Sequence, residues 1–569
     1  EMFGLLRPQS NLCRSAIELS NMWKIRYHGK EKPIAVSASW NEQYEDLFLE
    51  EGPLEYIYDL DVPMSWKNKR LRFYFGAVNT KSKVYLNDEL IGSNDIGYLP
   101  FECDPAGAIK YGSANSLRVE VENKLSKDGL PSGRMPGFEE GGNFPPANFD
   151  FFPYGGIIRM PYVEISSNAS ILDLNFRCDR SIPSKKLGIM DVKVEVNDEC
   201  IGKDIEVSIG DLKSTKKITS TKEDFHFEIK NTRFWELDDP YLYDLKAKIM
   251  SVGDLVDEYK LKVGIRTITL DDKHILLNGK SVKLLGFGKH EEFPVEGQGT
   301  FKPLIIKDYD LLKWIGANSF RTSHYPYSEE WLDMADELGF LVIDEAPHVG
   351  LEKYHYENPE TVKLCVDDIR RLIDRDKNHP SVIMWSVANE PDSAHPKSDE
   401  FFKKLYDTAK DCDPTRPVTM VSCVPFCKKS GGPDVAMKHF DVISVNRYYG
   451  WYNHQGKIEE AEKLLSDDLD ALRTYKRPVI LTEFGADAIS GFHANPAQMF
   501  SEEYQSEYIE KLFRVANEKD FVTGIHVWAF ADFKTAQNIH RPLFNYKGVF
   551  TRDRNPKMAA HTLRKLWRR

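Results

Sequence analysis

The stretch N-S-F-R-T-S-H-Y-P-Y-S-E-E-W-L-D-M-A-D-E-L-G-F-L-V-I-D-E, residues 318–345, decides the fold class. It opens and closes on strand-like runs, residues 318–326 and 340–345, and the segment between them has the apolar spacing of an amphipathic helix. A helix that joins two such strands is typical of a parallel sheet, because parallel neighbours need a long crossover connection. Residues 318–345 therefore predict an α/β domain.

The same alternation continues on both sides of this stretch. Strand-like apolar runs recur with helical segments between most of them, over about 290 residues, which is the length and rhythm of a (β/α)8 barrel. We expect this TIM barrel to occupy residues 269–569. Its eight strand-like runs are residues 282–291, 318–326, 340–347, 382–390, 416–422, 441–450, 478–485 and 524–533.

Residues upstream of the barrel have a different pattern. Short runs alternate apolar with polar residues, and helical periodicity is nearly absent, which predicts two antiparallel β modules. The pair Asn87-Asp88 is expected to form a hairpin turn. The segment W-E-L-D-D-P-Y, residues 235–241, resembles the turn before a late strand of an immunoglobulin-like sandwich. We place the module boundaries near residues 165 and 268, giving domains 1–165, 166–268 and 269–569.

Composition excludes several classes of protein. Of 569 residues, 41% are apolar and 29% charged, and the formal net charge is −12, so we expect a globular protein and neither nucleic acid nor a membrane as partner. No run reaches the ~20 apolar residues of a membrane helix, and the start lacks the apolar core of a secretory signal. These features predict a cytoplasmic protein, or a periplasmic one if a signal peptide has been removed. The eight cysteines are expected to be reduced.

The chemistry is expected where the barrel strands end. The carboxyl ends of barrel strands form the active face of this fold, and these ends are rich in carboxylates, imidazoles and amides. Any one such residue is as often a helix cap or an ion-pair partner, but the whole ring is hard to explain in that way. Its members are His290, Glu291, His324, Asp344, Glu345, Asn389, Glu390, Asn446, Tyr448 and Glu483, with Trp528 and Asp532 on the eighth run.

Two glutamates of this ring suit glycoside hydrolysis. That reaction needs one carboxylic acid to protonate the leaving oxygen and a second carboxylate to attack the anomeric carbon or activate water. Glu390 and Glu483 each follow an apolar run, on the fourth and seventh strands. Asp344 and Glu345 compete for the same roles, and spacing alone rejects neither.

A family resemblance distinguishes between these carboxylates. Residues 318–345 and R-D-K-N-H-P-S-V-I-M-W-S-V-A-N-E-P, residues 375–391, resemble signatures of glycoside hydrolase family 2, and within it the β-glucuronidases. The resemblance implies that Glu390 is the general acid/base and Glu483, in P-V-I-L-T-E-F-G-A-D, the nucleophile of a retaining double displacement. It covers the β half more loosely. There it implies the order of a jelly-roll sugar-binding-like domain, an immunoglobulin-like sandwich and the barrel.

The resemblance also implies a sugar pocket. Asn545 and Lys547 match an Asn-x-Lys motif that binds the carboxylate of a uronic acid, where cationic and amide donors are needed. Asp150 matches an aspartate that the first domain contributes to the site. The complete set of substrate-binding residues expected is Asp150, His324, Asn389, Asn446, Tyr448, Tyr452, Trp528, Arg541, Asn545 and Lys547.

The expected function is therefore the hydrolysis of small-molecule or oligosaccharide β-D-glucuronides by an exo-acting, retaining enzyme, with no cofactor and no metal. The family also implies a homo-oligomer, a dimer or tetramer. Alternatives are a β-galacturonidase, a β-galactosidase, for which we find no convincing set of metal ligands, or a non-catalytic carbohydrate-binding protein. One departure from the family is the segment E-A-P-H-V-G-L-E-K-Y-H-Y-E-N-P-E-T, residues 345–361, which is too short to cover an aglycone.

Overall fold

Eight parallel strands close into a barrel in the carboxyl-terminal half of this computed structural model, which describes residues 5–134, 142–426 and 430–568. Each of the eight predicted runs overlaps one barrel strand, so the (β/α)8 prediction is confirmed. The strands are β21 (Leu284–Gly288), β22 (Ser319–Arg321), β23 (Leu341–Glu345), β24 (Val382–Asn389), β25 (Val418–Ser422), β26 (Val442–Asn446), β27 (Val479–Glu483) and β28 (Val522–Trp528).

Amphipathic helices surround this barrel. The stretch first quoted forms β22, a helix and β23 as expected, and the helix ends at Gly339, whose φ of 80° suits a residue without a side chain. The helices are α1 (Lys302–Ile315), α2 (Glu329–Leu338), α3 (Lys353–Glu357), α4 (Pro359–Asp376), α5 (Ser398–Cys412), α6 (Ile458–Ala471), α7 (Glu502–Asn517) and α8 (Met558–Trp567). Among the described helices, none is long and apolar enough to span a membrane.

The first β sandwich pairs a six-stranded sheet, in the order β3-β2-β4-β9-β6-β7, with a four-stranded sheet, in the order β1-β10-β5-β8. Asn87 and Asp88 join β6 to β7 with φ values of 51° and 66°, which confirms the predicted hairpin. The strands are β1 (Ser15–Glu18), β2 (Trp23–Tyr27), β3 (Lys30–Ile34), β4 (Leu54–Val62), β5 (Arg70–Asn79), β6 (Lys81–Leu86), β7 (Glu89–Asn94), β8 (Phe101–Cys103), β9 (Ser113–Glu122) and β10 (Gly156–Ser166).

The second β sandwich pairs sheets in the orders β11-β12-β15 and β14-β13-β16-β17. Its strands are β11 (Ile171–Arg177), β12 (Leu187–Val196), β13 (Asp204–Ile209), β14 (Leu212–Lys217), β15 (Lys222–Lys230), β16 (Tyr243–Ser251) and β17 (Asp254–Val263). A small sheet of β18 (Ile268–Leu270), β19 (Ile275–Leu277) and β20 (Lys280–Val282) leads into the barrel. The hairpin of β29 (Phe533–Lys534) and β30 (Phe544–Asn545) follows the eighth barrel strand.

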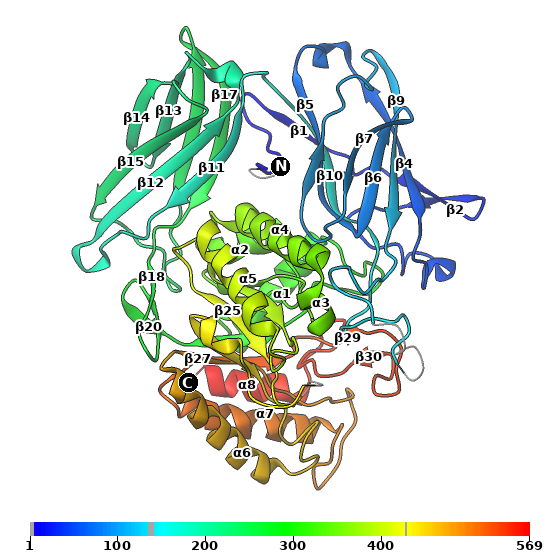
Figure 1. The fold of residues 1–569 in the computed structure, drawn as a ribbon, viewed down its shortest axis with the longest axis vertical. Coiled ribbons are helices and arrows are strands. Elements are labelled where there is room, and N and C mark those ends of the chain that lie inside the picture. Colours follow the sequence, from blue (N-terminus) through cyan, green and yellow to red (C-terminus); the bar gives the residue numbers. More distant parts are fainter. Residues whose placement is uncertain (1–4, 135–141, 427–429, 569) are drawn as a thin grey trace.

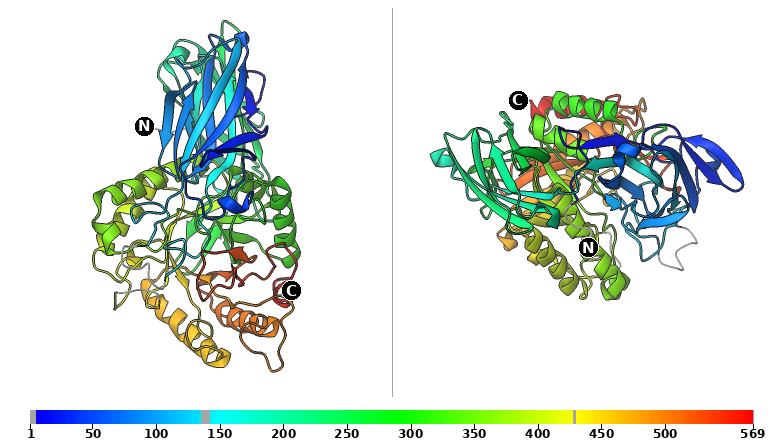
Figure 2. Two further views of the ribbon diagram at one scale, coloured as in Figure 1. Left: turned by 90° about the vertical axis from the view of Figure 1, so that its right-hand side faces the viewer. Right: turned by 90° about the horizontal axis from the view of Figure 1, so that it is seen from above.

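The two sandwiches stand side by side on the barrel, and the N-terminal segment runs between them (Figures 1 and 2). Leu6 of this segment packs in the core of the second sandwich, although the segment precedes the first. Arg14, fully buried, pairs with Glu164 of the first sandwich and Asp257 of the second. The predicted multidomain class is confirmed.

Cys423 is disulfide-bonded, so the expectation of reduced cysteines is wrong there, and Cys427 lies outside the described residues.

Candidate active site

A cavity of about 330 Å³ opens at the carboxyl ends of the barrel strands, on the side where the first sandwich meets the barrel. Both predicted catalytic carboxylates line it. Eight of the ten predicted substrate-binding residues line it too; Asn446 and Lys547 are the other two and lie one layer behind. The lining consists of Arg134, Asn143, Ala147, Asn148, Phe149, Asp150, His324, Val349, Gly350, Asn389, Glu390, Tyr448, Tyr452, Glu483, Trp528, Arg541 and Asn545.

Glu483 ends β27 and is held from two sides. Arg321 donates from Nη2 to Oε1 at 2.5 Å, and the Tyr448 hydroxyl donates to Oε2 at 2.7 Å. Burial raises the pKa of Glu483, the Arg321 guanidinium opposes this shift, and the negative charge of Glu390 adds to it. A carboxylate fixed in this way has little freedom to rotate, which suits a nucleophile that must attack along one line.

Glu390 follows β24 directly and has a φ of 49°, a left-handed conformation that a glutamate rarely adopts. Its backbone N–H donates to the carbonyl of Val421 at 2.8 Å, and its Oε1 accepts from Asn446 Nδ2 at 2.8 Å. Asn446 therefore orients the carboxylate instead of facing the cavity. Unlike the buried Glu483, the side chain of Glu390 is partly exposed, as access to a leaving group and to water requires.

The competing carboxylates on β23 are occupied elsewhere. Glu345 accepts from Arg321 at 2.7 and 2.8 Å, from His324 at 2.8 Å and from Ser386 at 2.7 Å. Burial would raise its pKa, but Arg321, His324 and Ser386 together more than offset this, and the pKa of Glu345 is lowered. Successive residues of a strand face opposite ways, and Asp344 accordingly faces Thr322 and Asp376. Neither carboxylate lines the cavity.

The far end of the cavity carries paired charges from two domains. Asp150 of the first domain accepts from Arg541 Nη2 at 2.9 Å and from Asn545 Nδ2 at 3.0 Å. The hydroxyl of Tyr452 accepts from Arg541 at 2.6 Å and from Lys547 Nζ at 2.7 Å. These contacts bring the predicted uronate motif, the first-domain aspartate and the predicted tyrosine together at one place.

Lys547 is fully buried, and its Nζ lies 2.5 Å from Asp487 Oδ1. Burial would raise the pKa of Asp487, but Lys547, Arg541 and the N–H of Tyr546 together lower it. The ammonium also lies 4.6 Å from the ring centroid of Tyr452. The positive charge of Lys547 therefore lies directly behind Tyr452, which lines the cavity.

Aromatic and amide side chains complete the wall beside the nucleophile. The rings of His324 and Trp528 stack at 5.1 Å with an interplanar angle of 22°. Trp528 can lie there because Gly485, two residues after the nucleophile, packs on its carbonyl: a Cβ at Gly485 would come within 2.0 Å of that oxygen. Asn389 is almost fully buried and accepts from Arg321 at 3.3 Å.

Sequence reasoning missed two charged residues that lie behind the lining of the cavity, Arg321 and Asp487. Arg321 lies in the first quoted stretch, three residues before His324, and an arginine at the end of a barrel strand was the available signal. Asp487 follows Glu483 by four residues in a loop, and nothing in its spacing points to Lys547. The remaining unpredicted lining residues are Arg134, Asn143, Ala147, Asn148, Phe149, Val349 and Gly350.

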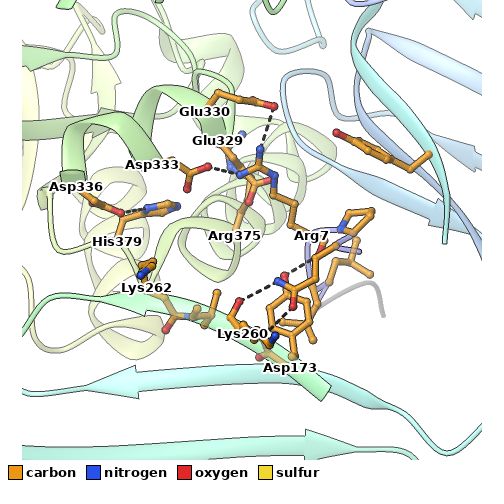
Figure 3. Close-up of a pocket in the computed structure, with 18 of the residues that line it drawn as sticks. Arg7, Asp173, Lys260, Lys262, Glu329, Glu330, Asp333, Asp336, Arg375 and His379 are labelled. Atoms are coloured by element: carbon orange, nitrogen blue, oxygen red, sulfur yellow. Dashed lines mark hydrogen bonds and ion pairs between the residues drawn. The ribbon is translucent and has the colours of Figure 1, made fainter. Parts of the chain in front are cut away.

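A larger cavity, of about 480 Å³, lies where the N-terminal segment, the second sandwich and the barrel meet (Figure 3). Arg7 extends to Glu330 at 3.0 Å and to Asp333 at 2.5 Å. Asp336 accepts from His379 at 2.6 Å; burial would lower the pKa of His379, but this aspartate raises it to about 9. Asp333, Asp336 and His379 are close enough for one metal ion, yet ion pairs already engage all three. We interpret this cavity as a domain joint.

Comparisons with known proteins agree with the geometry. A family model described as "Glycosyl hydrolases family 2, TIM barrel domain" matches residues 268–569, and one described as "Glycosyl hydrolases family 2" matches residues 162–266. The chain belongs to glycoside hydrolase family 2. The resemblance inferred from the sequence is thereby confirmed, and the family 2 barrel is the domain that carries both glutamates.

Similar family 2 proteins share its whole length. A β-glucuronidase from Paenibacillus borealis is 37% identical, with 99% of this chain and 98% of the relative covered; the one from Homo sapiens is 32% identical, with 99% and 92% covered. The β-D-glucuronidase structure from Dictyoglomus thermophilum has a TM-score of 0.90 at 37% identity, covering 99% of both chains. The Bifidobacterium dentium β-glucuronidase, complexed with coumarin-3-O-glucuronide, has a TM-score of 0.94 at 34% identity, covering 99% and 98%.

Proposed function

We propose that this family 2 enzyme is an exo-acting, retaining β-glucuronidase. The observation that carries the proposal is one cavity lined by two carboxylates, Glu390 and Glu483, and by the cation Arg541, with Lys547 directly behind the lining residue Tyr452. Relatives named β-glucuronidase, which align over almost the whole chain, support it. The substrate class would be β-D-glucuronides with a small-molecule or oligosaccharide aglycone.

In the proposed mechanism, Glu483 attacks the anomeric carbon while Glu390 protonates the oxygen of the aglycone. Arg321 and Tyr448 hold the Glu483 carboxylate in line until it forms the ester with the sugar. Glu390, now ionised, takes a proton from water, and this water attacks the anomeric carbon from the same face as the departed aglycone. The bond from that carbon to the Glu483 oxygen breaks, which releases the sugar and restores the carboxylate. Two inversions leave the β configuration unchanged, and the two carboxyl groups should lie ~5–5.5 Å apart.

The sugar carboxylate would bind where the paired charges gather. A uronate brings one negative charge into a buried place, and its desolvation is costly unless cations and directed donors replace water. Arg541, Asn545 and Lys547 can supply these donors. Asp150 and Asp487 partly neutralise them, so the empty site does not hold uncompensated positive charge.

The remaining predicted residues would bind the ring. Asn389 is proposed to hydrogen-bond the 2-hydroxyl group, an interaction that strengthens in an oxocarbenium-like transition state. The stacked rings of His324 and Trp528 form a wall against which a sugar can pack. Tyr452, 47% exposed, closes the cavity from the opposite side.

The rival functions are testable in one assay. The assay compares initial rates on the p-nitrophenyl derivatives of β-D-glucuronide, β-D-galacturonide and β-D-galactoside. The substrate that is cleaved fastest distinguishes a β-glucuronidase from a β-galacturonidase or a β-galactosidase. Hydrolysis of none of the three would support a non-catalytic carbohydrate-binding protein. We expect the glucuronide to be cleaved fastest. Glu390→Gln and Glu483→Gln should each remove nearly all activity while leaving the fold intact, which circular dichroism would check. NMR that detected α-glucuronic acid as the first product would contradict retention.

Two further expectations remain predictions. The protein is proposed to be a homo-oligomer, so sedimentation should give two or four times the chain mass of 65.5 kDa. A cytoplasmic location is proposed from composition alone, and fractionation of the source cells would test it.

A further inference from the structure

The short segment after β23 is bonded to the backbone that carries the proposed acid/base. The N–H of Asn389 donates to the carbonyl of His348 at 3.0 Å, and the N–H of Gly350 donates to the carbonyl of Asn389 at 3.0 Å. Beyond Glu390, the N–H of Asp392 donates to the carbonyl of Leu351 at 2.7 Å. Residues 348–351 thus hold the chain on both sides of Glu390.

His348 in turn anchors this segment to the barrel wall. Its imidazole is fully buried, with Nδ1 at 2.8 Å from the carbonyl oxygen of Val387 in β24 and Nε2 at 2.9 Å from Asp368 Oδ2 in α4. A carbonyl can only accept, so Nδ1 carries a proton. The approach of Nε2 to Asp368 Oδ2 is short, although it is not aligned as a hydrogen bond.

Glu390 depends on such support more than an ordinary strand residue does. Its left-handed backbone conformation is disfavoured for a residue with a side chain and persists only where the surroundings impose it. The direct support of its side chain from Asn446 is one hydrogen bond to Oε1. Release of residues 348–351 would let the backbone relax and move the carboxyl group away from the leaving oxygen.

We propose that His348, fixed by Asp368, is a positioning residue that aims Glu390 at the leaving oxygen. The inference rests on the proposed roles of Glu390 and Glu483. His348 does not line the cavity, and its effect would pass through the backbone of Asn389. Any disturbance of Asn389, which is proposed to bind the sugar, would affect all glucuronides alike, so the positioning of Glu390 is measured by the loss on poor leaving groups in excess of that common loss.

The test uses the dependence of kcat/KM on the leaving group. A phenolate such as p-nitrophenolate departs with little help from an acid, whereas an alkoxide needs a proton from Glu390. For His348→Ala we expect a loss of roughly 10- to 100-fold in kcat/KM on an alkyl β-D-glucuronide, and of less than about threefold on p-nitrophenyl β-D-glucuronide, because misplacement of a catalytic group by ~1 Å costs on this order. KM should change little on either substrate.

A matched control is available in the same loop. His355 is also fully buried and also bonds backbone groups, the carbonyl of Lys127 and the N–H of Glu352, but it does not touch residues 387–392. His355→Ala should lower the melting temperature without any leaving-group dependence. Should His348→Ala not fold, Asp368→Asn keeps the shape of the partner, removes its charge, and should give the same substrate dependence in weaker form.

Equal losses on both glucuronides for His348→Ala, or the same dependence in His355→Ala, would overturn the positioning role. Failure of the proposed function gives a different result: the unaltered enzyme would then cleave neither glucuronide.

Discussion

Arg321 joins two carboxylates that would otherwise repel each other at the centre of the barrel. Its Nη1 bonds Glu345 and its Nη2 bonds Glu483, and all three side chains are buried. Such a network is strong only while complete, since removal of one member leaves an unpaired charge out of water. The arginine thereby favours the ionised form of Glu483, which its role as nucleophile requires, against the larger effect of burial.

The pKa of Glu483 predicts the acid side of the pH profile. Burial raises this pKa, so kcat/KM, which follows ionisation in the free enzyme, should fall on acidification through a point above the ~4.3 of an ordinary glutamate. The hydrogen bond from Tyr448 lowers the pKa, so Tyr448→Phe should move this limb to higher pH. Tyr452→Phe, which makes no contact with Glu483, should leave it in place. A downward shift in Tyr448→Phe would contradict the assignment.

Lys547 predicts the selectivity between sugars. We expect the double variant Lys547→Met/Asp487→Asn, which avoids an unpaired buried aspartate, to lose ~1.5–3 kcal/mol of transition-state binding on a glucuronide, roughly 10- to 150-fold in kcat/KM. Trace hydrolysis of the matching β-D-glucoside should survive, because that sugar carries no carboxylate. The ratio of the two rates is the measurement.

A second buried lysine–aspartate pair provides the control. Lys557 lies 2.8 Å from Asp532 and also donates to the carbonyl of Tyr546, next to Lys547, but neither member of this pair bonds Tyr452. Lys557→Met/Asp532→Asn should change both rates in parallel. If the Lys547 variant also changed both rates equally, Lys547 would be a structural residue and the case for a uronate substrate would lose its main support.

Single residues could be predicted from the sequence where the fold fixes their direction. Two buried strands end at Asn389 and Glu483, and Glu390 directly follows the first of them. The barrel prediction therefore already placed all three residues at the same rim of the barrel. The partners of Lys547 and Glu483 could not be predicted in this way. Asp487 pairs with Lys547, and Arg321 with Glu483, only because loops and neighbouring strands come together in the folded protein. A single sequence does not show which of its segments do so.

At the scale of elements, the connection after β23 determines what covers the leaving group. β23 ends at Glu345 and α3 begins at Lys353, so only residues 346–352 join them, and these pack along β24. The sequence predicted this short connection because the two flanking patterns lie close together. It could not predict the bonds to Asn389, since pairing outside regular strands leaves no periodic signal.

This short connection predicts tolerance of large aglycones. Residues 346–352 are too few to fold over a leaving group, so kcat/KM on an oligosaccharide glucuronide should be at least comparable to that on a small aromatic glucuronide. The comparison is a direct competition of the two substrates in one vessel, with products separated by chromatography. A large preference for the small aromatic substrate would contradict an open aglycone side.

At the scale of the whole molecule, the first sandwich is part of the active site and the second is not. Asp150 reaches Arg541 and Asn545 of the barrel, and the backbone of Phe152 bonds Lys534 at 2.9 Å. The second sandwich meets the barrel at the other cavity, around Arg7 (Figure 3). The family resemblance implied the contribution of Asp150 to the site, but the order of domains alone predicted neither joint, because alternation along a chain does not show how folded domains pack together.

The two joints should therefore differ in their effect on catalysis. Arg552 of the barrel bonds Glu42 of the first sandwich at 2.9 Å and Glu292 of the barrel at 2.8 Å, and all three are largely buried. Arg552→Met leaves both carboxylates without this partner, a change that typically costs ~3–5 kcal/mol. Because the same joint holds the segment that carries Asp150, kcat/KM on the glucuronide should fall together with the melting temperature.

Arg7→Met tests the opposite joint. Arg7 is 29% exposed and neutralises Glu330 and Asp333, so its loss should destabilise the fold by roughly 1–3 kcal/mol through repulsion among the acidic residues of α2. The cavity with Glu390 and Glu483 has no residue in common with this joint, so kcat/KM at a temperature below both transitions should equal that of the unaltered enzyme. Added salt screens the repulsion and should restore part of the lost melting temperature. A fall in kcat/KM for Arg7→Met as large as for Arg552→Met would mean that the second sandwich also shapes the sugar pocket, and that the three domains act as one rigid catalytic unit.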